Sequence, residues 1–156
     1  MKLQNQNLSK DFTLRELISS ATAVRHGIDN TPSHDQIENL VRLCRETLQP
    51  ARDELNTVVT VSGGFRSKRV NTLVKGAKKS DHMDGNAADL EAYDNARLFH
   101  TLRKQGNFDQ LIWEFGNTQE PDWVHVSNRG SGKNRKQVLV AYINEQGKTA
   151  YKPWKS

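Results

Sequence analysis

The sequence predicts an α+β fold in which helices pack on one side of a mostly antiparallel sheet. Capping boxes and apolar residues at helical spacing are concentrated before residue 56. Short runs of β-branched and aromatic residues follow from residue 58 onward and are separated by turn residues. Helices that precede the strands, instead of alternating with them, are typical of the α+β class. With 156 residues and no linker or repeat, we expect one domain over residues 1–156.

Two helices are predicted in the first third of the chain. The segments TLRE at residues 13–16 and SHDQ at residues 33–36 are capping boxes, so we expect helices over residues 14–21 and from residue 34 onward. The second helix presents an apolar face made of Ile37, Leu40, Val41, Cys44 and Leu48. Pro50 is expected to end this helix or to kink it, and in the second case residues 51–55 continue it beyond the kink. Cys44, the single cysteine, is expected to be a small buried hydrophobe and not a nucleophile.

The strands are predicted in the rest of the chain. We expect strands over residues 58–61, 89–92, 110–115 and 123–127, followed by a terminal hairpin of residues 138–143 and 149–151. Two short helices are expected between them, over residues 67–74 and from the cap Asp94 to residue 105. Alternation along the 123–127 strand places Trp123, His125 and Ser127 on one face.

The segment SDHMDGNAAD at residues 80–89 holds two metal-ligand residues, His82 and Asp89. On a helix their spacing of seven residues would separate them by roughly 10 Å. Zinc–ligand bonds of about 2.0–2.2 Å exclude that separation. Gly85 lets the chain turn between them, so we expect a loop, a turn and the start of a strand. Either residue alone would be more typical of a solvated loop.

A second segment, DWVH at residues 122–125, adds another imidazole. His82, Asp89 and His125 together match a catalytic zinc site, in which three protein ligands leave the fourth position to water. Zinc in such a site lowers the pKa of a bound water to about 7, and a nearby carboxylate can take the proton. The pattern therefore indicates metal-assisted hydrolysis.

The chain resembles the family of zinc D-Ala-D-Ala carboxypeptidases and L-alanyl-D-glutamate endopeptidases, which includes phage and bacterial wall hydrolases. The resemblance covers roughly residues 8–142 and is carried by SGGFRS at 62–67, the 80–89 segment, FDQLIWE at 108–114 and DWVH at 122–125. Phe65 stands where the family often has tyrosine. The resemblance implies a hedgehog/DD-peptidase-like zinc peptidase fold and one Zn²⁺ bound by His82, Asp89 and His125.

The resemblance also implies roles for other residues. Asp122, three residues before His125, is in the position of the general base; Glu120 is the competing carboxylate, but its spacing differs by two residues and a proline intervenes. Arg66 matches the family's arginine and is expected to bind a substrate carboxylate or to stabilise the developing oxyanion. Ser80 is expected to hydrogen-bond the substrate, and the alternative is a serine that only forms the turn.

The function that the resemblance implies is cleavage of a peptide bond in bacterial peptidoglycan by a phage-type endolysin or related cell-wall hydrolase. Endopeptidases and carboxypeptidases share these motifs, so the bond that is cut stays open. One alternative is a non-catalytic, metal-binding structural protein of a virion with the same fold. Another is a basic nucleic-acid-binding protein, but that role leaves the histidine and aspartate group unexplained. A serine or cysteine hydrolase is disfavoured because no nucleophile elbow is present.

The formal net charge of +5 arises mainly at the end of the chain, where residues 129–156 hold seven Lys or Arg against one acidic residue. Such a surface favours polyanions such as nucleic acid, teichoic acid, lipopolysaccharide or acidic wall peptides and does not distinguish among them, and a charge that only aids solubility is the alternative. With the resemblance, we expect anionic envelope polymers as partners and no specific nucleic-acid partner. The first twelve residues lack the apolar core of a signal peptide, and no run reaches the 18 apolar residues of a membrane span. We therefore expect a monomer made in the cytoplasm that acts on the cell wall after release, or that is associated with a virion.

Overall fold

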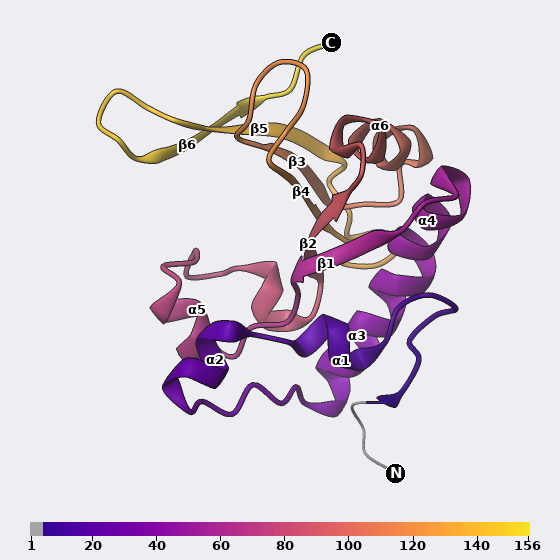
Figure 1. Cartoon of the computed structure of the whole chain (residues 1–156), viewed down its shortest axis with the longest axis vertical. Helices are drawn as coiled ribbons and strands as arrows, with labels where there is room; N and C mark the ends of the chain where they lie inside the picture. The colour runs from indigo at the N-terminus through magenta and orange to yellow at the C-terminus, as the bar shows by residue number, and fades with distance from the viewer. Residues whose placement is uncertain (1–4) are drawn as a thin grey trace.

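The computed structural model describes residues 5–156 and confirms the α+β class (Figure 1). Six strands form one sheet in the order β1-β2-β4-β3-β5-β6. Four of the neighbouring pairs are antiparallel, and only β3 and β5 are parallel. The strands are β1 Val59–Gly63, β2 Ala87–Ala92, β3 Gln110–Glu114, β4 Trp123–Ser127, β5 Gln137–Ile143 and β6 Thr149–Pro153. The prediction of a mostly antiparallel sheet is therefore confirmed.

Both predicted capping boxes form, at Thr13 and at Ser33. The α-helices are α1 Leu14–Ile18, α2 Ala21–His26, α3 His34–Leu43, α4 Gln49–Leu55, α5 Lys68–Leu73 and α6 Asn95–Gln105. Two further turns are the π-helix η2 Cys44–Leu48 and the 3₁₀-helix η3 Asp81–Asp84. The expected helix over residues 14–21 ends early, because Ser19 has extended backbone angles and the side chain of Ser20 caps a separate helix, α2.

Pro50 neither ends nor interrupts the helix that contains it. It lies in the first turn of α4, where a missing N–H costs little. The preceding turn, η2, widens into a π-helix in which the N–H of Gln49 bonds the carbonyl of Cys44. Cys44 itself is fully buried, and burial raises the pKa of its thiol to about 12. An inert packing role for this cysteine agrees with the prediction.

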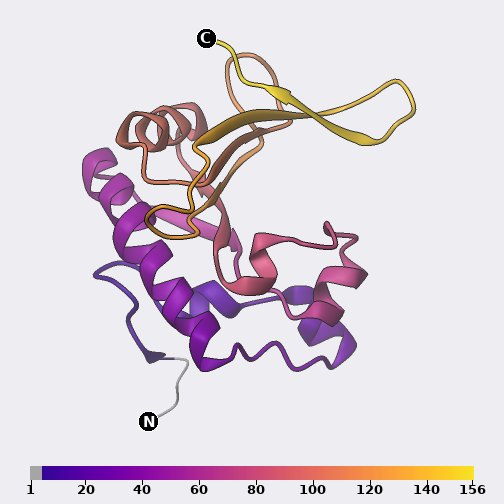
Figure 2. The same cartoon turned by 180° about the vertical axis from the view of Figure 1, so that it is seen from behind.

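The two faces of the sheet have different surroundings. One face packs on helices: α6 contacts β2, β3 and β4, and α1 contacts β1. This face contributes Leu90, Leu111, Trp113, Val124 and Val126 to the hydrophobic core. The register of the strands aligns Asp89, His125, Ile112 and Leu139 across the opposite face. The β5–β6 hairpin projects from the sheet edge in both views (Figures 1 and 2). Two of the polar residues predicted for the site, Asp89 and His125, thus share the face that the helices leave free.

None of the described helices is long and apolar enough to cross a membrane. The expectation that the first twelve residues form no signal peptide rests in part on residues 1–4, which lie outside the described residues.

Candidate metal centre

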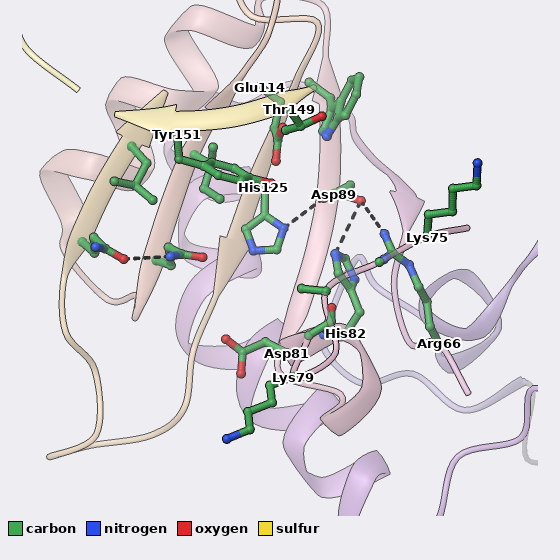
Figure 3. Close-up of a pocket in the computed structure, with 18 of the residues that line it drawn as sticks. Arg66, Lys75, Lys79, Asp81, His82, Asp89, Glu114, His125, Thr149 and Tyr151 are labelled. Carbon is green, nitrogen blue, oxygen red and sulfur yellow. Dashed lines mark hydrogen bonds and ion pairs between the residues drawn. The ribbon is translucent and has the colours of Figure 1, made fainter. Parts of the chain in front are cut away.

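The three predicted ligands, His82, Asp89 and His125, come together on the free face of the sheet (Figure 3). Asp89 on β2 pairs directly with His125 on β4, and His82 approaches from η3. Nδ1 of His125 lies 3.1 Å from Oδ1 of Asp89, and Nε2 of His82 lies 3.5 Å from Oδ2 of Asp89. One ligand atom from each residue lies within 4.8 Å of the others. Tetrahedral zinc with bonds of about 2.1 Å holds its ligand atoms roughly 3.4 Å apart, so the three residues fit one ion.

The turn between His82 and Asp89 forms as the spacing predicts. A single 3₁₀ turn, η3, ends at Gly85, which has a φ of +75°. A β-carbon at this position would also lie 2.5 Å from the carbonyl oxygen of Gln36, so only glycine fits. Strand β2 then begins at Ala87, two residues before the predicted start, and carries Asp89 into the sheet.

The orientation of His82 leaves one ring nitrogen free for a metal. Nδ1 of this residue lies 2.8 Å from the carbonyl oxygen of Gly64. A carbonyl can only accept a hydrogen bond, so Nδ1 carries the proton and the lone pair of Nε2 faces Asp89. His82 is only 3% exposed, and this burial lowers its pKa, although the negative charge of Asp89 acts to raise it. A neutral imidazole with a free Nε2 is the form that binds zinc.

In the absence of a metal, the pKa values of the other two ligands shift in opposite directions. Burial disfavours the charged form of Asp89, but His82 and His125 outweigh it and lower the pKa of the carboxyl. Burial also disfavours the charged form of His125, but the hydrogen bond and charge of Asp89 outweigh it and raise the pKa of this imidazole. A cation at the centre would satisfy Asp89 in place of the imidazole proton.

Arg66 and Ser80, the two predicted substrate-binding residues, lie beside the ligands. Nη2 of Arg66 is 3.4 Å from Oδ2 of Asp89, and Nη1 is 3.4 Å from Oδ1 of Asn71. The hydroxyl of Ser80 accepts a hydrogen bond from the backbone N–H of His82 at 3.3 Å. Ser80 therefore has the turn-forming role that was its alternative interpretation, and a contact of either residue with substrate stays a prediction.

A cavity of about 670 Å³ opens beside the three ligands. Its lining is mostly polar and includes Arg66, Lys75, Lys79, Ser80, Asp81, Glu114, Trp123, Arg129 and Tyr151. The lining residues come from η3, from strands β2 to β6, and from the loops that flank α5 and follow β4. The metal centre thus lies in the wall of a cleft that can hold an extended polar ligand.

Asp122, the predicted general base, is exposed and is not among the described residues that line this cavity. Successive residues of a strand point to opposite faces, so Asp122, three positions before His125, would point away from the face that carries His125. The competing carboxylate, Glu120, accepts a hydrogen bond from the backbone N–H of Asn95 at the start of α6. The fold therefore brings neither carboxylate to the ligands, and the catalytic role of Asp122 stays an untested prediction.

Glu114, at the end of β3, is a pocket residue to which the sequence analysis gave no role. It pairs with Trp123 on β4 and so shares the face of His125. Glu114 is 7% exposed, and burial raises the pKa of its carboxyl to about 7, although His125 and Arg66 lower it. A signal is present in the sequence: Gln110, Ile112 and Glu114 alternate along a predicted strand, and the carboxylate of Glu114 directly follows the apolar residues 111–113.

The raised pKa of Glu114 predicts a pH-dependent stability of the metal-free protein. The unfolded carboxyl ionises near 4.5 and the folded one near 7, so stability is lost as pH rises through this interval and stays lost above it. The cost at pH 8 is about 3 kcal/mol at most. We expect metal-free Glu114→Gln to be more stable than the wild type at pH 8 and equally stable at pH 4.5 in urea unfolding. Asp122→Asn is the matched control, and an equal gain in both variants would contradict the assignment to Glu114.

The fold and this site together define a class: a metal-dependent hydrolase in which two imidazoles and a carboxylate could hold a metal ion in a polar cleft. Residues 10–127 match the family model described as Peptidase M15, and the chain belongs to this family of zinc peptidases related to the D-Ala-D-Ala carboxypeptidases. No curated protein matches the chain.

Proposed function

We propose that this protein is a zinc metallopeptidase that cleaves a peptide bond in bacterial peptidoglycan. The observation that carries the proposal is the approach of His82, Asp89 and His125 in the wall of a polar cleft. Membership of the M15 family supports the same chemistry. A zinc ion held by these residues would polarise the scissile carbonyl and lower the pKa of a water.

The chain's own residues would bind and orient the peptide. The cavity is lined by five cationic side chains, one of which, Arg135, binds the buried Asp109; the others are those of Arg66, Lys75, Lys79 and Arg129. Asp89 and Asp81 partly neutralise two of them, Arg66 and Arg129. The remaining positive charge suits the carboxylates of an acidic wall peptide. Ser80 lies next to the ligands and offers a hydroxyl to the substrate backbone.

A change of Arg66 to lysine is expected to impair turnover although the charge is kept. The guanidinium spans Asn71 and Asp89 through separate nitrogens, which one ammonium cannot reproduce. We expect Arg66→Lys to lower kcat/KM on purified peptidoglycan by about tenfold or more, with the zinc content unchanged. Lys75→Arg, a charge-preserving change elsewhere in the cavity, is the control. If Arg66→Lys has wild-type kinetics, Arg66 contributes to turnover only through its positive charge and not through its planar guanidinium.

We further propose that the protein is a lysis enzyme of the phage endolysin type that acts on the wall after release from the cytoplasm. The basic segment 129–156 supports attraction to an anionic envelope, a long-range effect that salt weakens. Two of its charges have structural partners: Arg135 binds the buried Asp109, and Arg129 binds Asp81. Exposed lysines such as Lys133 and Lys136 are therefore the better candidates for envelope binding.

Digestion of purified peptidoglycan tests the proposed activity. New amino groups and mass spectrometry of the released muropeptides would identify the bond and separate an endopeptidase from a carboxypeptidase. The metal-free protein and protein reloaded with zinc form the control pair. No product from the zinc-loaded wild type would contradict the enzymatic proposal and favour the non-catalytic virion protein.

A further inference from the structure

The carboxylates around the cleft differ in whether they have a hydrogen-bond or ion-pair partner within the protein. Asp81 is paired with Arg129, Asp109 is bound by Arg135, and the Glu120 carboxylate accepts from Asn95. Asp89 belongs to the ligand group. Within residues 5–156, no hydrogen bond or ion pair is formed by the carboxylate of Glu114. A nearly buried carboxylate that faces a cavity without a protein partner is a functional-site candidate.

The position of Glu114 relative to the ligands is set by the sheet. Ile112 on β3 is opposite His125, and Glu114 is the next residue of the same face, opposite Trp123. Its side chain enters the cavity from the β3 side, above the imidazole of His125 (Figure 3). On the other side of Glu114, the small Ala141 separates it from Tyr151 of β6 in the same cross-strand row. The carboxylate is therefore held on rigid strands and faces the metal centre.

We propose that Glu114, and not Asp122, is the catalytic carboxylate of this peptidase. The assignment rests on the proposed function. The Glu114 carboxylate takes one proton from the attacking water as its oxygen bonds the scissile carbonyl carbon. The same proton then passes to the nitrogen of the leaving amine as the C–N bond breaks. Water is consumed, one carboxyl and one amine are produced, and Glu114 returns to its starting state.

The surroundings of Glu114 suit both halves of this transfer. A general base must ionise near the working pH, and its conjugate acid must be strong enough to protonate an amine. The Glu114 carboxylate is 7% exposed and lines the cavity beside His125, and the positive charges of His125 and Arg66 favour its ionised form against burial, as a bound metal cation would also do. Asp122 is exposed at the strand start, outside the cavity, and its backbone N–H and carbonyl bind Glu114 and Asn95. These backbone hydrogen bonds give Asp122 a structural role just before β4.

Two isosteric variants, Glu114→Gln and Asp122→Asn, test the assignment. We expect Glu114→Gln to lose 10²–10⁴-fold in kcat on a muropeptide that the wild type cleaves. Its zinc stoichiometry, its zinc affinity and its KM should stay within about twofold of wild type. These readouts would move if Glu114 only supported the fold. Asp122→Asn should keep turnover, zinc content and the acidic limb of the pH–kcat profile.

The outcomes separate this inference from the proposed function. If the wild type cleaves the peptide and Glu114→Gln cleaves it equally fast, Glu114 is not the catalytic carboxylate. If Asp122→Asn loses activity while it keeps zinc and Glu114→Gln does not, the base is Asp122. If the zinc-loaded wild type cleaves no wall peptide, the proposed peptidase function fails instead.

Discussion

His82→Ala is expected to bind zinc so weakly that the purified protein contains almost none. The change removes the one ligand whose free ring nitrogen is fixed by a second hydrogen bond, from Nδ1 to the carbonyl of Gly64. Loss of such supporting partners alone typically costs 10–100-fold in metal affinity, so we expect the loss of the ligand itself to exceed 100-fold. Metal analysis of purified protein, and competition with a zinc-binding dye, would measure it. Hydrolysis should fall in parallel.

His34→Ala is the matched control for His82→Ala. His34 is exposed at the start of α3 and pairs with Glu38, far in sequence from the ligands. We expect wild-type zinc content in this variant, and unfolding curves would verify that both alanine proteins are folded. Full zinc occupancy in folded His82→Ala would falsify the ligand assignment, and loss of zinc in both variants would indicate a second metal position.

The sequence predicted the metal centre because its ligands are marked by residue type and spacing. Histidine and aspartate around a glycine turn leave few arrangements that satisfy bonds of about 2 Å, so His82 and Asp89 could be joined before any tertiary structure was available. His125 followed from a second segment of matching chemistry. Local chain geometry thus joins His82 to Asp89, whereas His125 reaches them only through the pairing of β2 with β4.

The carboxylate beside the metal was harder to find because its position depends on strand pairing. Asp122 is close to His125 in sequence, yet the period of two along the chain opposes a common face. Glu114 is eleven residues from His125, and only the antiparallel register of β3 and β4 brings it to that face. The π-turn before Pro50 was also not predicted: the N–H of Gln49 bonds the carbonyl of Cys44, and Pro50 lies in the first turn of α4, which follows. Such long-range effects cannot be read from local patterns.

Gly64→Ala is expected to weaken the fold and the metal site together. Gly64 follows β1 and faces the end of α1, where a β-carbon would overlap with the carbonyl oxygen of Leu17 and lie 2.8 Å from its carbonyl carbon. This overlap can be relieved only by movement of the backbone, because the overlapping atoms of Leu17 belong to the main chain and not to a flexible side chain. The N–H of Phe65 bonds this same Leu17 oxygen at 2.6 Å, so the movement would also strain the contact between α1 and the sheet. We expect a loss of about 1–3 kcal/mol, the usual cost of overpacking.

The metal site should report the same movement, since the carbonyl of Gly64 accepts the hydrogen bond that orients His82. We therefore expect Gly64→Ala to lower zinc affinity by about 10–100-fold, the effect of losing a supporting partner. Gly147→Ala is the control: this glycine has a φ of +72° in the β5–β6 turn and no atom within 4 Å of an added β-carbon. It should lose roughly 1–2 kcal/mol through backbone strain alone and keep its zinc affinity. Equal zinc affinity in the two alanine variants would mean that the Gly64 carbonyl does not hold His82 in place, and that the metal centre is independent of how α1 packs on β1.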